Sequence, residues 1–474
     1  MPFRRTASNP IDVRSARPSP TQMRTTADVV ICGAGIAGVA AAYHLAVRQG
    51  VRRVVLVDER EPLTLTSDKG TQGYRNWWPG PDDTMLRLVS RSIDLLEESA
   101  AANGNAFRMN RRGYLFATGD TAEATRMEAT AREVSAFGMG PVRVHRGPGT
   151  YAGTTHEGFA GREAGADVLL GDEARRAFPY LAGDTVAALH VRRAGWLSAV
   201  ALGSWLIEQA VVAGTTFVRD RVDGVRTTGG RVRGVRLASG DTIETDRFVV
   251  AAGPGLPMVA RMLDIELPVF HELHSKLTIR DPRRVVPRDA PFTIWNDPVR
   301  LDWTDAERKV LAGSEETGRL IDELPGGVHA RPVDLAHGDE LYLIWTFETD
   351  VRPYIWPPIF SSRYADVVLR GCARMIPGME QYVGTTTGVV DGGYYCKTPE
   401  NRPLIGPLPV TGAFVIGALS GSGLMSAHAM GELVAQHVAG APLPDYAHWF
   451  LPSRYDDPAY RQLVDGWGPL VGQL

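Results

Sequence analysis

The segment Asp28-Val-Val-Ile-Cys32-Gly33-Ala-Gly35-Ile-Ala-Gly38 leads from a short apolar run into three glycines at fixed spacing. The apolar run predicts a buried strand, and the alanine-rich residues 36–49 predict a helix that stops at Gly50. Val54-Val-Leu-Val57 predicts a second buried strand. These elements form a β-α-β unit with two parallel strands, which predicts an α/β fold.

The glycines of this turn have separate physical tasks. Gly33 permits the tight turn out of the strand, Gly35 lets the backbone approach a pyrophosphate, and Gly38 lets the helix pack against the strand. The helix N-terminus offers N–H groups and a partial positive charge to phosphates. Asp58 ends the second strand 20 residues after Gly38, where a carboxylate accepts hydrogen bonds from ribose hydroxyls. This order of elements predicts a dinucleotide site; the alternative is a glycine turn in another α/β fold.

The composition excludes several classes of protein. The 474 residues are 44% hydrophobic and 22% charged and carry a net charge of −3, so we expect neither nucleic acid nor a membrane as partner. The three cysteines form no C-x-x-C pair, which argues against a disulfide framework and a cysteine zinc site, and we predict no metal. No apolar run reaches 18 residues. We expect a cytoplasmic protein.

Residues 1–26 differ from the rest of the chain. They contain five arginines, four prolines and a single acid, Asp12. An organellar targeting peptide has a similar composition, but the prolines interrupt an amphipathic helix. We predict a disordered tail, with the targeting peptide as the alternative.

The remaining pattern predicts two lobes. Long helical patterns occur at 82–103, 361–376 and 424–438, and residues 265–350 predict a mostly antiparallel sheet. The predicted fold class is α/β (α+β, two-lobed), with a Rossmann-like FAD-binding domain and a second domain on a mostly antiparallel sheet. The expected division is an FAD-binding domain of 27–80, 185–262 and 388–442, a substrate domain of 81–184 and 263–387, and a C-terminal extension of 443–474.

Several blocks together resemble the D-amino-acid-oxidase-like (DAO) superfamily of FAD enzymes, which includes glycine oxidase, monomeric sarcosine oxidase and dimethylglycine dehydrogenase. The matching blocks cover most of the chain between residues 28 and 440. They are Val29 to Arg60, Ser67 to Trp78, Val222 to Gly255, Thr398 to Gly406 and Gly417 to Leu433. The resemblance implies FAD rather than NAD.

The resemblance also implies which residues hold the cofactor. The turn Ser420-Gly-Ser-Gly423 opens a helix that would face the pyrimidine end of the flavin, where reduction places negative charge that a helix N-terminus stabilises. The alternative is a glycine turn before an ordinary helix. The implied FAD-binding residues are Gly33, Gly35, Ile36, Gly38, Asp58, Glu59, Arg60, Ser67, Thr71, Gln72, Val222, Ala252, Gly253, Gly421, Gly423, Leu424 and Met425.

Residues 67–78 resemble, without gaps, the segment that crosses the flavin in the sarcosine oxidases. In this register Arg75 corresponds to the arginine that binds the substrate carboxylate there, and a guanidinium grips a carboxylate through two parallel bonds. The alternative is a surface arginine. The lysine that shares this carboxylate in the family is replaced by Met425.

Other departures from the family pattern concern the flavin. Gly393 stands at the flavin-linking cysteine of sarcosine oxidase, with Cys396 three residues later, and Gly70 stands at the flavin-linking histidine of dimethylglycine dehydrogenase. We therefore predict non-covalent FAD. Tyr342 stands at the oxygen-activating lysine of sarcosine oxidase, which leaves open whether oxygen or another acceptor takes the electrons.

Phe270-His-Glu-Leu-His-Ser-Lys276 predicts a strand over the flavin. Its period of two places Glu272, His274 and Lys276 on one face, so Glu272 and His274 are candidate acid–base groups. The alternatives are a solvated strand edge and a structural ion pair.

The leading prediction is an FAD-dependent amine or amino-acid oxidase or dehydrogenase. It would oxidise a C–N bond by transfer of a hydride to flavin N5, and the imine product would hydrolyse. Its candidate catalytic residues are Arg75, Glu272, His274 and Tyr342. One alternative is another flavin oxidation, such as hydroxylation or desaturation in a biosynthetic pathway. The other is a non-redox binding module on the same fold.

Overall fold

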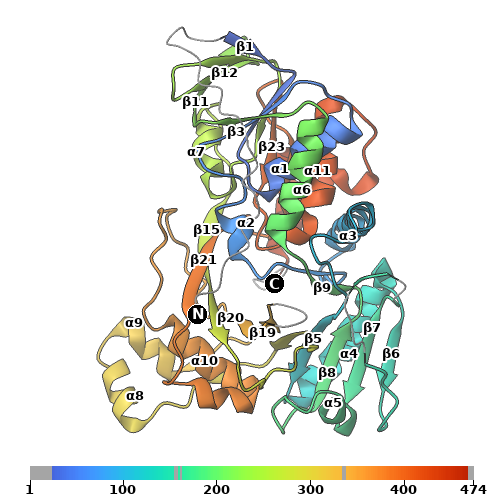
Figure 1. Cartoon of the computed structure of the whole chain (residues 1–474), viewed down its shortest axis with the longest axis vertical. Coiled ribbons are helices and arrows are strands. Elements are labelled where there is room, and N and C mark those ends of the chain that lie inside the picture. Colours follow the sequence, from blue (N-terminus) through green and yellow to red (C-terminus); the bar gives the residue numbers. More distant parts are fainter. Residues whose placement is uncertain (1–23, 154–157, 161–162, 334–337, 468–474) are drawn as a thin grey trace, which may run out of the picture.

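The computed structural model describes residues 24–153, 158–160, 163–333 and 338–467. These residues form two lobes, each built on its own large sheet, and strands β15 (Phe270–Arg280) and β21 (Val389–Lys397) run between them (Figure 1). The predicted tail 1–26 lies outside the described residues except for its end. There, Arg24–Thr26 form β1, which pairs in parallel with β13 (Thr242–Glu244).

The upper lobe of Figure 1 contains a six-stranded sheet in the order β10-β3-β2-β14-β23-β22. Only β22 runs antiparallel to its neighbour. The β-α-β prediction for residues 28–58 is thereby confirmed. The strands are β2 (Val29–Cys32), β3 (Val54–Asp58), β10 (Thr216–Arg219), β14 (Phe248–Val250), β22 (Leu404–Pro407) and β23 (Ala413–Gly417).

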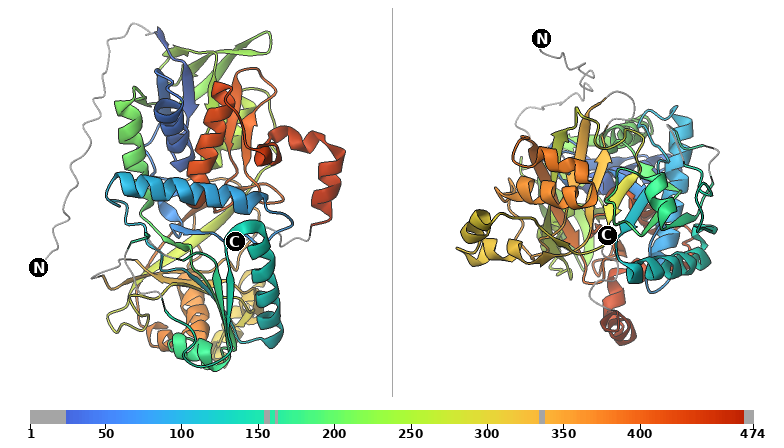
Figure 2. Two further views of the ribbon diagram at one scale, coloured as in Figure 1. Left: turned by 90° about the vertical axis from the view of Figure 1, so that its right-hand side faces the viewer. Right: turned by 90° about the horizontal axis from the view of Figure 1, so that it is seen from below.

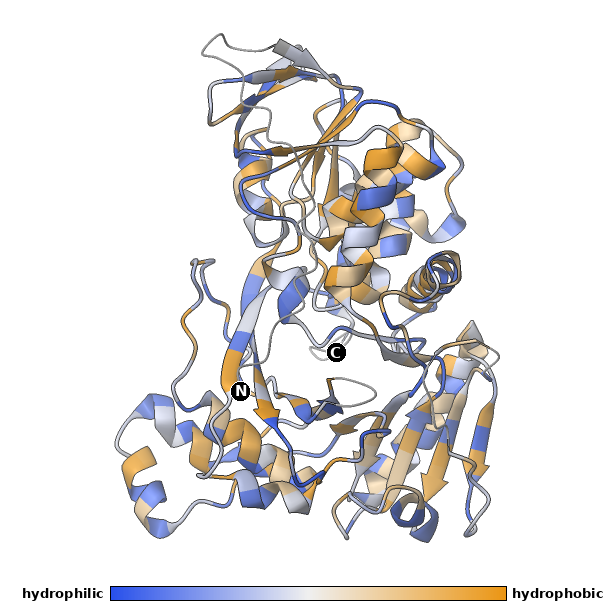
Figure 3. Cartoon of the chain, in the orientation of Figure 1, coloured by the Kyte–Doolittle hydropathy of each residue, from blue (hydrophilic) through white to orange (hydrophobic). Residues whose placement is uncertain are grey.

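Alternate residues of these strands face two different layers. Val29 and Ile31 pack into a core with the helices α1 (Ile36–Tyr43), α6 (Ala199–Val212) and α11 (Gly423–Ala439). Val30 and Cys32 pack on the other side, against the small sheet β1-β13-β12-β11. The strands are apolar throughout because both faces are covered, and Figure 3 shows the hydrophobic colour of the helices that cover one of them. The small sheet also contains β11 (Val222–Thr228) and β12 (Arg231–Leu237).

The lower lobe contains a nine-stranded sheet in the order β21-β15-β20-β19-β16-β5-β8-β7-β6. All neighbours are antiparallel except β16 with β5 and β6 with β7, so the predicted fold class is confirmed. The strands not yet introduced are β5 (Tyr114–Thr118), β6 (Val142–His145), β7 (Ala166–Leu170), β8 (Ala187–Val191), β16 (Phe292–Trp295), β19 (Val328–Pro332) and β20 (Glu340–Ile344).

The two faces of this sheet have opposite character. Leu277, Leu341 and Leu343 face a hydrophobic core that includes α10 (Tyr364–Met375). Register pairs place the intervening residues on the other face, where Arg331 lies opposite Tyr342. This second face looks toward the upper lobe (Figure 1), and it positions the site.

Several elements differ from the sequence prediction. Residues 265–350 contain two helices, α8 (Asp305–Leu311) and α9 (Glu315–Gly318), in addition to strands. β21 begins at Val389, later than the predicted 384–391 strand. The predicted helix at 82–103 is α3 (Thr84–Ala102), which crosses between the lobes in the left view of Figure 2. Among the described helices, none is both long and apolar enough to cross a membrane.

Candidate functional site

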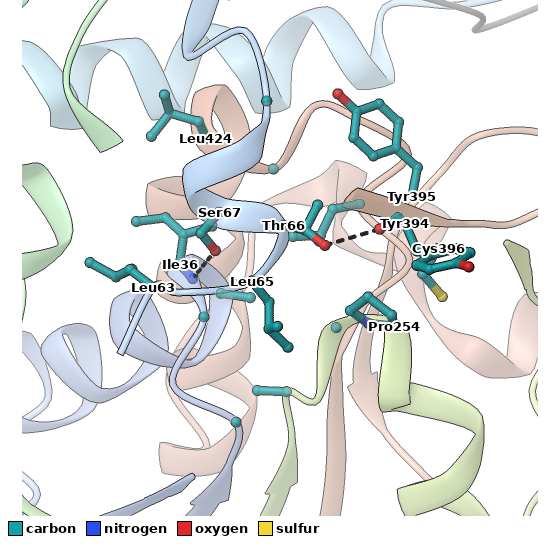
Figure 4. A pocket seen from close by; sticks show the side chains of 18 of the residues that line it. Ile36, Leu63, Leu65, Thr66, Ser67, Pro254, Tyr394, Tyr395, Cys396 and Leu424 are labelled. Atoms are coloured by element: carbon teal, nitrogen blue, oxygen red, sulfur yellow. Dashed lines mark hydrogen bonds between the residues drawn. The ribbon is translucent and has the colours of Figure 1, made fainter. Parts of the chain in front are cut away.

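A cleft with about 1020 Å³ of empty space lies at the carboxyl ends of β2, β3, β14 and β23. This is the edge of a parallel sheet where α/β folds bind ligands. Its walls come from four parts of the chain, which meet in Figure 4. The wall segments are 33–37, 58–73, 251–254 and 394–424, each contributing part of its residues.

The glycine turn at one end of the cleft tolerates no side chain at Gly33 or Gly38. Gly33 has φ +111°, and a Cβ there would collide with the carbonyl oxygen of Ala251. A Cβ on Gly38 would collide with the carbonyl oxygen of Gly33. No side chain caps α1 at Gly35, but the Ser67 hydroxyl accepts a hydrogen bond from the Ile36 N–H at 2.9 Å (Figure 4). An oxygen therefore already lies at this helix N-terminus.

Asp58 is held in place at the end of β3. Its carboxylate accepts hydrogen bonds from the backbone N–H of Ala34 at 2.7 Å and of Arg60 at 2.9 Å. Burial raises the pKa of Asp58, although these two hydrogen bonds act to lower it. Arg60 also lines the cleft and stacks on Trp356 at 5.0 Å, whereas Glu59 is exposed.

The other end of the cleft is formed by the turn before α11. Gly421 has φ +81°, and a Cβ on it would lie 2.6 Å from the ring of Tyr395. Gly423 and Leu424 line the same wall, at the first turn of α11. Ser67, Thr71, Gln72, Ala252 and Gly253 also line the cleft. Val222 and Met425 are instead buried in the cores on either side of the sheet.

Glu272 and His274 form a buried network on the cleft-facing side of β15. Lys397 Nζ donates to both Glu272 oxygens at 3.0 and 2.9 Å, and the His274 Nε2 lies 2.9 Å from Glu272 Oε2. The His274 ring stacks on Tyr395 at 3.9 Å between centroids. Burial lowers the pKa of His274, while Glu272 opposes this shift. Glu272 is thus part of an ion pair, and His274 lies nearer the cleft wall.

Arg75 and Tyr342 are not among the residues that line the cleft, but Arg75 lies two residues after Gly73, which is. Arg75 ends β4 (Gly73–Arg75), is 7% exposed, and lies with its guanidinium carbon 5.1 Å from the ring centroid of Tyr114. Two cations flank Tyr342: Lys276 Nζ at 4.2 Å and the guanidinium carbon of Arg331 at 4.6 Å from its ring centroid. The alternative to substrate binding, that Arg75 is a surface arginine, is wrong, because the side chain is buried.

Arg331 was not singled out from the sequence. It is 2% exposed and donates through Nε to the carbonyl of Thr71, a residue of the cleft wall, at 2.9 Å. No motif surrounds Arg331, and only the alternation of β19 with its neighbours places it beside Tyr342. The available signal was a period-two pattern in β19, in which His329 and Arg331 alternate with Val328 and Ala330.

The family follows from a comparison with known proteins. A family model described as DAO, FAD dependent oxidoreductase, matches residues 28–437. The chain belongs to this family. The superfamily resemblance and the dependence on FAD predicted from the sequence are confirmed, and the protein is an FAD-dependent oxidoreductase of the DAO family.

Individual relatives are distant. Mitochondrial sarcosine dehydrogenase of Mus musculus is 25% identical over 482 residues, which cover 97% of this chain and 44% of the mouse protein. The L-proline dehydrogenase of P. horikoshii superposes with a TM-score of 0.71 at 19% identity, covering 92% of this chain and 99% of that one. Iminodiacetate oxidase of Chelativorans sp. BNC1 superposes with a TM-score of 0.65 at 20% identity, covering 90% of this chain and 98% of that one. The two structures show the DAO fold.

The residues present fit FAD. The collisions that a Cβ would cause at Gly33 and Gly38 keep the turn close to α1, so that phosphates can approach the helix N-terminus. Asp58 is a fixed acceptor at the adenosine end, and the first turn of α11 lies at the opposite end of the same cleft. A dinucleotide with a pyrophosphate between an adenosine and an isoalloxazine ring system matches this arrangement.

Proposed function

We propose that this DAO-family enzyme oxidises the C–N bond of a small amine or amino acid. The observation that carries the proposal is the burial of Arg75 at the end of β4, together with His274 and Tyr342 on the polar face of the nine-stranded sheet beside the FAD cleft. When bound, FAD accepts the two electrons and the hydrogen that leave the carbon beside nitrogen. Water then hydrolyses the resulting imine, and oxygen or another acceptor takes up the electrons.

The protein residues in this proposal bind, orient and deprotonate. Arg75 binds an acidic group of the substrate, and Tyr395 with His274 forms one wall of the site. Burial lowers the pKa of His274, so its imidazole is neutral at pH 7. Its Nδ1 lies 3.2 Å from the Thr346 hydroxyl, through which it would take up a proton from a substrate ammonium. Glu272 orients His274 through the 2.9 Å contact with Nε2.

The names of the three relatives suggest where to begin the substrate search. Sarcosine, L-proline and iminodiacetate are all amino acids with a secondary amine. We therefore propose secondary amino acids as the first substrate class. Substrate would enter between a FAD-binding domain of 27–80, 185–262 and 388–442 and a substrate domain formed by the intervening segments.

We also propose that FAD is held without a covalent bond, in a protein of the cytoplasm. Gly393 and Gly70 offer no nucleophile, and a Cβ on Gly393 would already lie 3.1 Å from Thr66. Cys396 lines the cleft, but burial raises the pKa of its thiol to about 12, so the reactive thiolate is scarce. After acid precipitation, the flavin absorption should move into the supernatant. A yellow pellet would contradict non-covalent binding.

The test of the reaction is anaerobic reduction of the bound flavin. Purified protein is mixed with secondary and primary amino acids and simple amines without oxygen, and the visible flavin bands are followed. We expect bleaching with at least one amine and recovery on admission of oxygen or an artificial acceptor. Flavin bands that persist across the whole panel would refute amine oxidation.

A further inference from the structure

Two buried guanidinium groups beside the cleft have no carboxylate partner among the described residues. Arg331 donates to two backbone carbonyls, those of Thr71 at 2.9 Å and Pro332 at 2.7 Å, and stacks on Trp196 at 5.1 Å. Arg75 lies over the Tyr114 ring, and its Nε has no hydrogen-bond partner in the described structure. Both side chains are less than 10% exposed.

The other charged side chains on, or next to, the polar face of the nine-stranded sheet are balanced. Glu272 pairs with Lys397 at 2.9 Å. Lys69 bridges Asp68 at 3.2 Å and Asp391 at 3.0 Å, and Asp391 is also the cross-strand neighbour of Lys276. Asp68 and Asp391 thus balance the charges of Lys69 and Lys276. Arg75 and Arg331 remain as an excess of two positive charges.

Such an excess is costly in a protein interior. A buried charge without a counter-charge loses its hydration, and buried ions are normally paired. The cost persists at neutral pH, because burial lowers the pKa of Arg331 only to about 10, where the guanidinium is still charged at pH 7. Anions that bind here gain charge-assisted, bidentate hydrogen bonds in a site already desolvated.

Both arginines are close enough to one phenol, that of Tyr114, for their charges to act on it. Tyr114 is buried and feels the charges of both Arg75 and Arg331, which oppose the rise in its pKa that burial causes. Arg75 belongs to the strand that continues the cleft wall, and Arg331 contacts that wall at Thr71. Both guanidinium groups therefore belong to residues next to the 71–73 segment of the cleft wall.

We infer that the substrate is an amine bearing two acidic groups, one held by Arg75 and the other by Arg331. The inference rests on the proposed amine oxidation for the identity of the substrate, but the anion site itself is independent of turnover. A substrate with one acidic group leaves one guanidinium unpaired in the complex, and a dianion pairs both.

The test measures binding of two inert probes to the FAD-loaded enzyme through changes in the flavin spectrum. Glutarate is butyrate with a second carboxylate in place of one hydrogen of its methyl group. We expect glutarate to bind about 10- to 100-fold more tightly, the ratio that one charge-assisted hydrogen bond to a buried group produces. Arg331→Met should abolish this preference and leave butyrate affinity within about twofold.

Control variants separate the effect of removing the Arg331 charge from an effect on protein folding. Arg280→Met removes an arginine whose side chain is 76% exposed and should leave both affinities unchanged. Arg331→Lys keeps a positive charge without the planar fork and should retain part of the preference. Equal affinity for the two probes in the wild-type enzyme would overturn the inference, as would equal losses for both probes in Arg331→Met. If Arg331→Met does not retain FAD, the ratio of glutarate to butyrate affinity in the Arg331→Lys and wild-type enzymes still tests the inference.

Substrate turnover distinguishes this inference from the proposed function. Iminodiacetate and sarcosine share the secondary amine and differ by one carboxylate. Faster anaerobic flavin reduction by iminodiacetate supports both amine oxidation and a substrate with two acidic groups. Faster reduction by sarcosine supports amine oxidation and refutes a substrate with two acidic groups. Glutarate preference without flavin reduction by any amine supports the anion site and refutes amine oxidation.

Discussion

Gly38 shows how strictly single positions are constrained at the cofactor turn. Its missing side chain leaves room for the carbonyl oxygen of Gly33, so helix α1 approaches the turn more closely than alanine would permit. Gly38→Ala should lower the free energy of unfolding by about 1–3 kcal/mol, the usual cost of overpacking, and weaken FAD binding. Urea unfolding and flavin content measure both effects. Gly183→Ala is the control, because a Cβ there meets nothing within 4 Å; equal stability of the two variants would contradict the packing argument.

His274 is the residue whose protonation should control the acid side of the pH profile. Burial lowers its pKa below 6.5, so the neutral imidazole persists at pH 7 and is lost only at lower pH. The rate of anaerobic flavin reduction should therefore fall toward acid pH, with an apparent pKa under 6.5.

The matching variant is His274→Asn. It should slow flavin reduction by about 100-fold, the lower range for a general base, and remove this acid limb. His448→Asn, at an exposed histidine, should change neither quantity. A full rate in His274→Asn would remove His274 from the list of acid–base groups.

At the scale of elements, the turn η1 (His44–Arg48), which directly follows α1, meets α11 through two buried histidines. His44 Nε2 lies 3.1 Å from His428 Nδ1, and Ser99 on α3 lies 3.2 Å from the other His428 nitrogen. Burial lowers the pKa of His44 to about 3 and that of His428 well below its usual value. Both rings therefore stay neutral in the folded protein, while the unfolded chain takes up protons below pH 6.5.

This difference predicts a loss of stability in acid. Because the unfolded state binds more protons, the free energy of unfolding should fall by about 2 kcal/mol per histidine between pH 7.5 and 5.0. Urea unfolding at the two pH values measures the drop. His428→Gln should make the drop smaller by about the contribution of one histidine, and His448→Gln should leave it unchanged. A drop that is identical in all three proteins would contradict the assignment.

The sequence predicted elements well where local signals are strong. The glycine turn, the acid after β3 and the amphipathic pattern of α3 are visible in consecutive residues, and the fold class followed from them. The helices α8 and α9 were missed because short helices carry little periodicity. Arg331 was missed for a different reason. Its role depends on pairing with β20 and on Thr71, 260 residues away, and neither contact leaves a local pattern.

At the scale of the whole molecule, FAD should act as a ligand of the folded state only. Its cleft joins segments from residue 33 to residue 424, which are together only when the upper lobe is folded. FAD at 100 times its Kd should add about 2.7 kcal/mol to the free energy of unfolding of flavin-free protein. For a protein of this size the Tm should rise by several degrees, measured by calorimetry. Gly38→Ala should show a smaller rise, and an unchanged Tm in the wild-type protein would speak against FAD as a ligand of the cleft.

The alternation of the nine-stranded sheet has a consequence for how the enzyme can change during evolution. Ala330 faces the hydrophobic core and Arg331 faces the cleft, one residue apart on β19. A single-residue insertion in this strand would exchange the two faces and put a charge into the core, so changes of length are confined to loops. Substitutions on the cleft face leave the core untouched. New substrate preferences can therefore arise one residue at a time on a scaffold that keeps its stability.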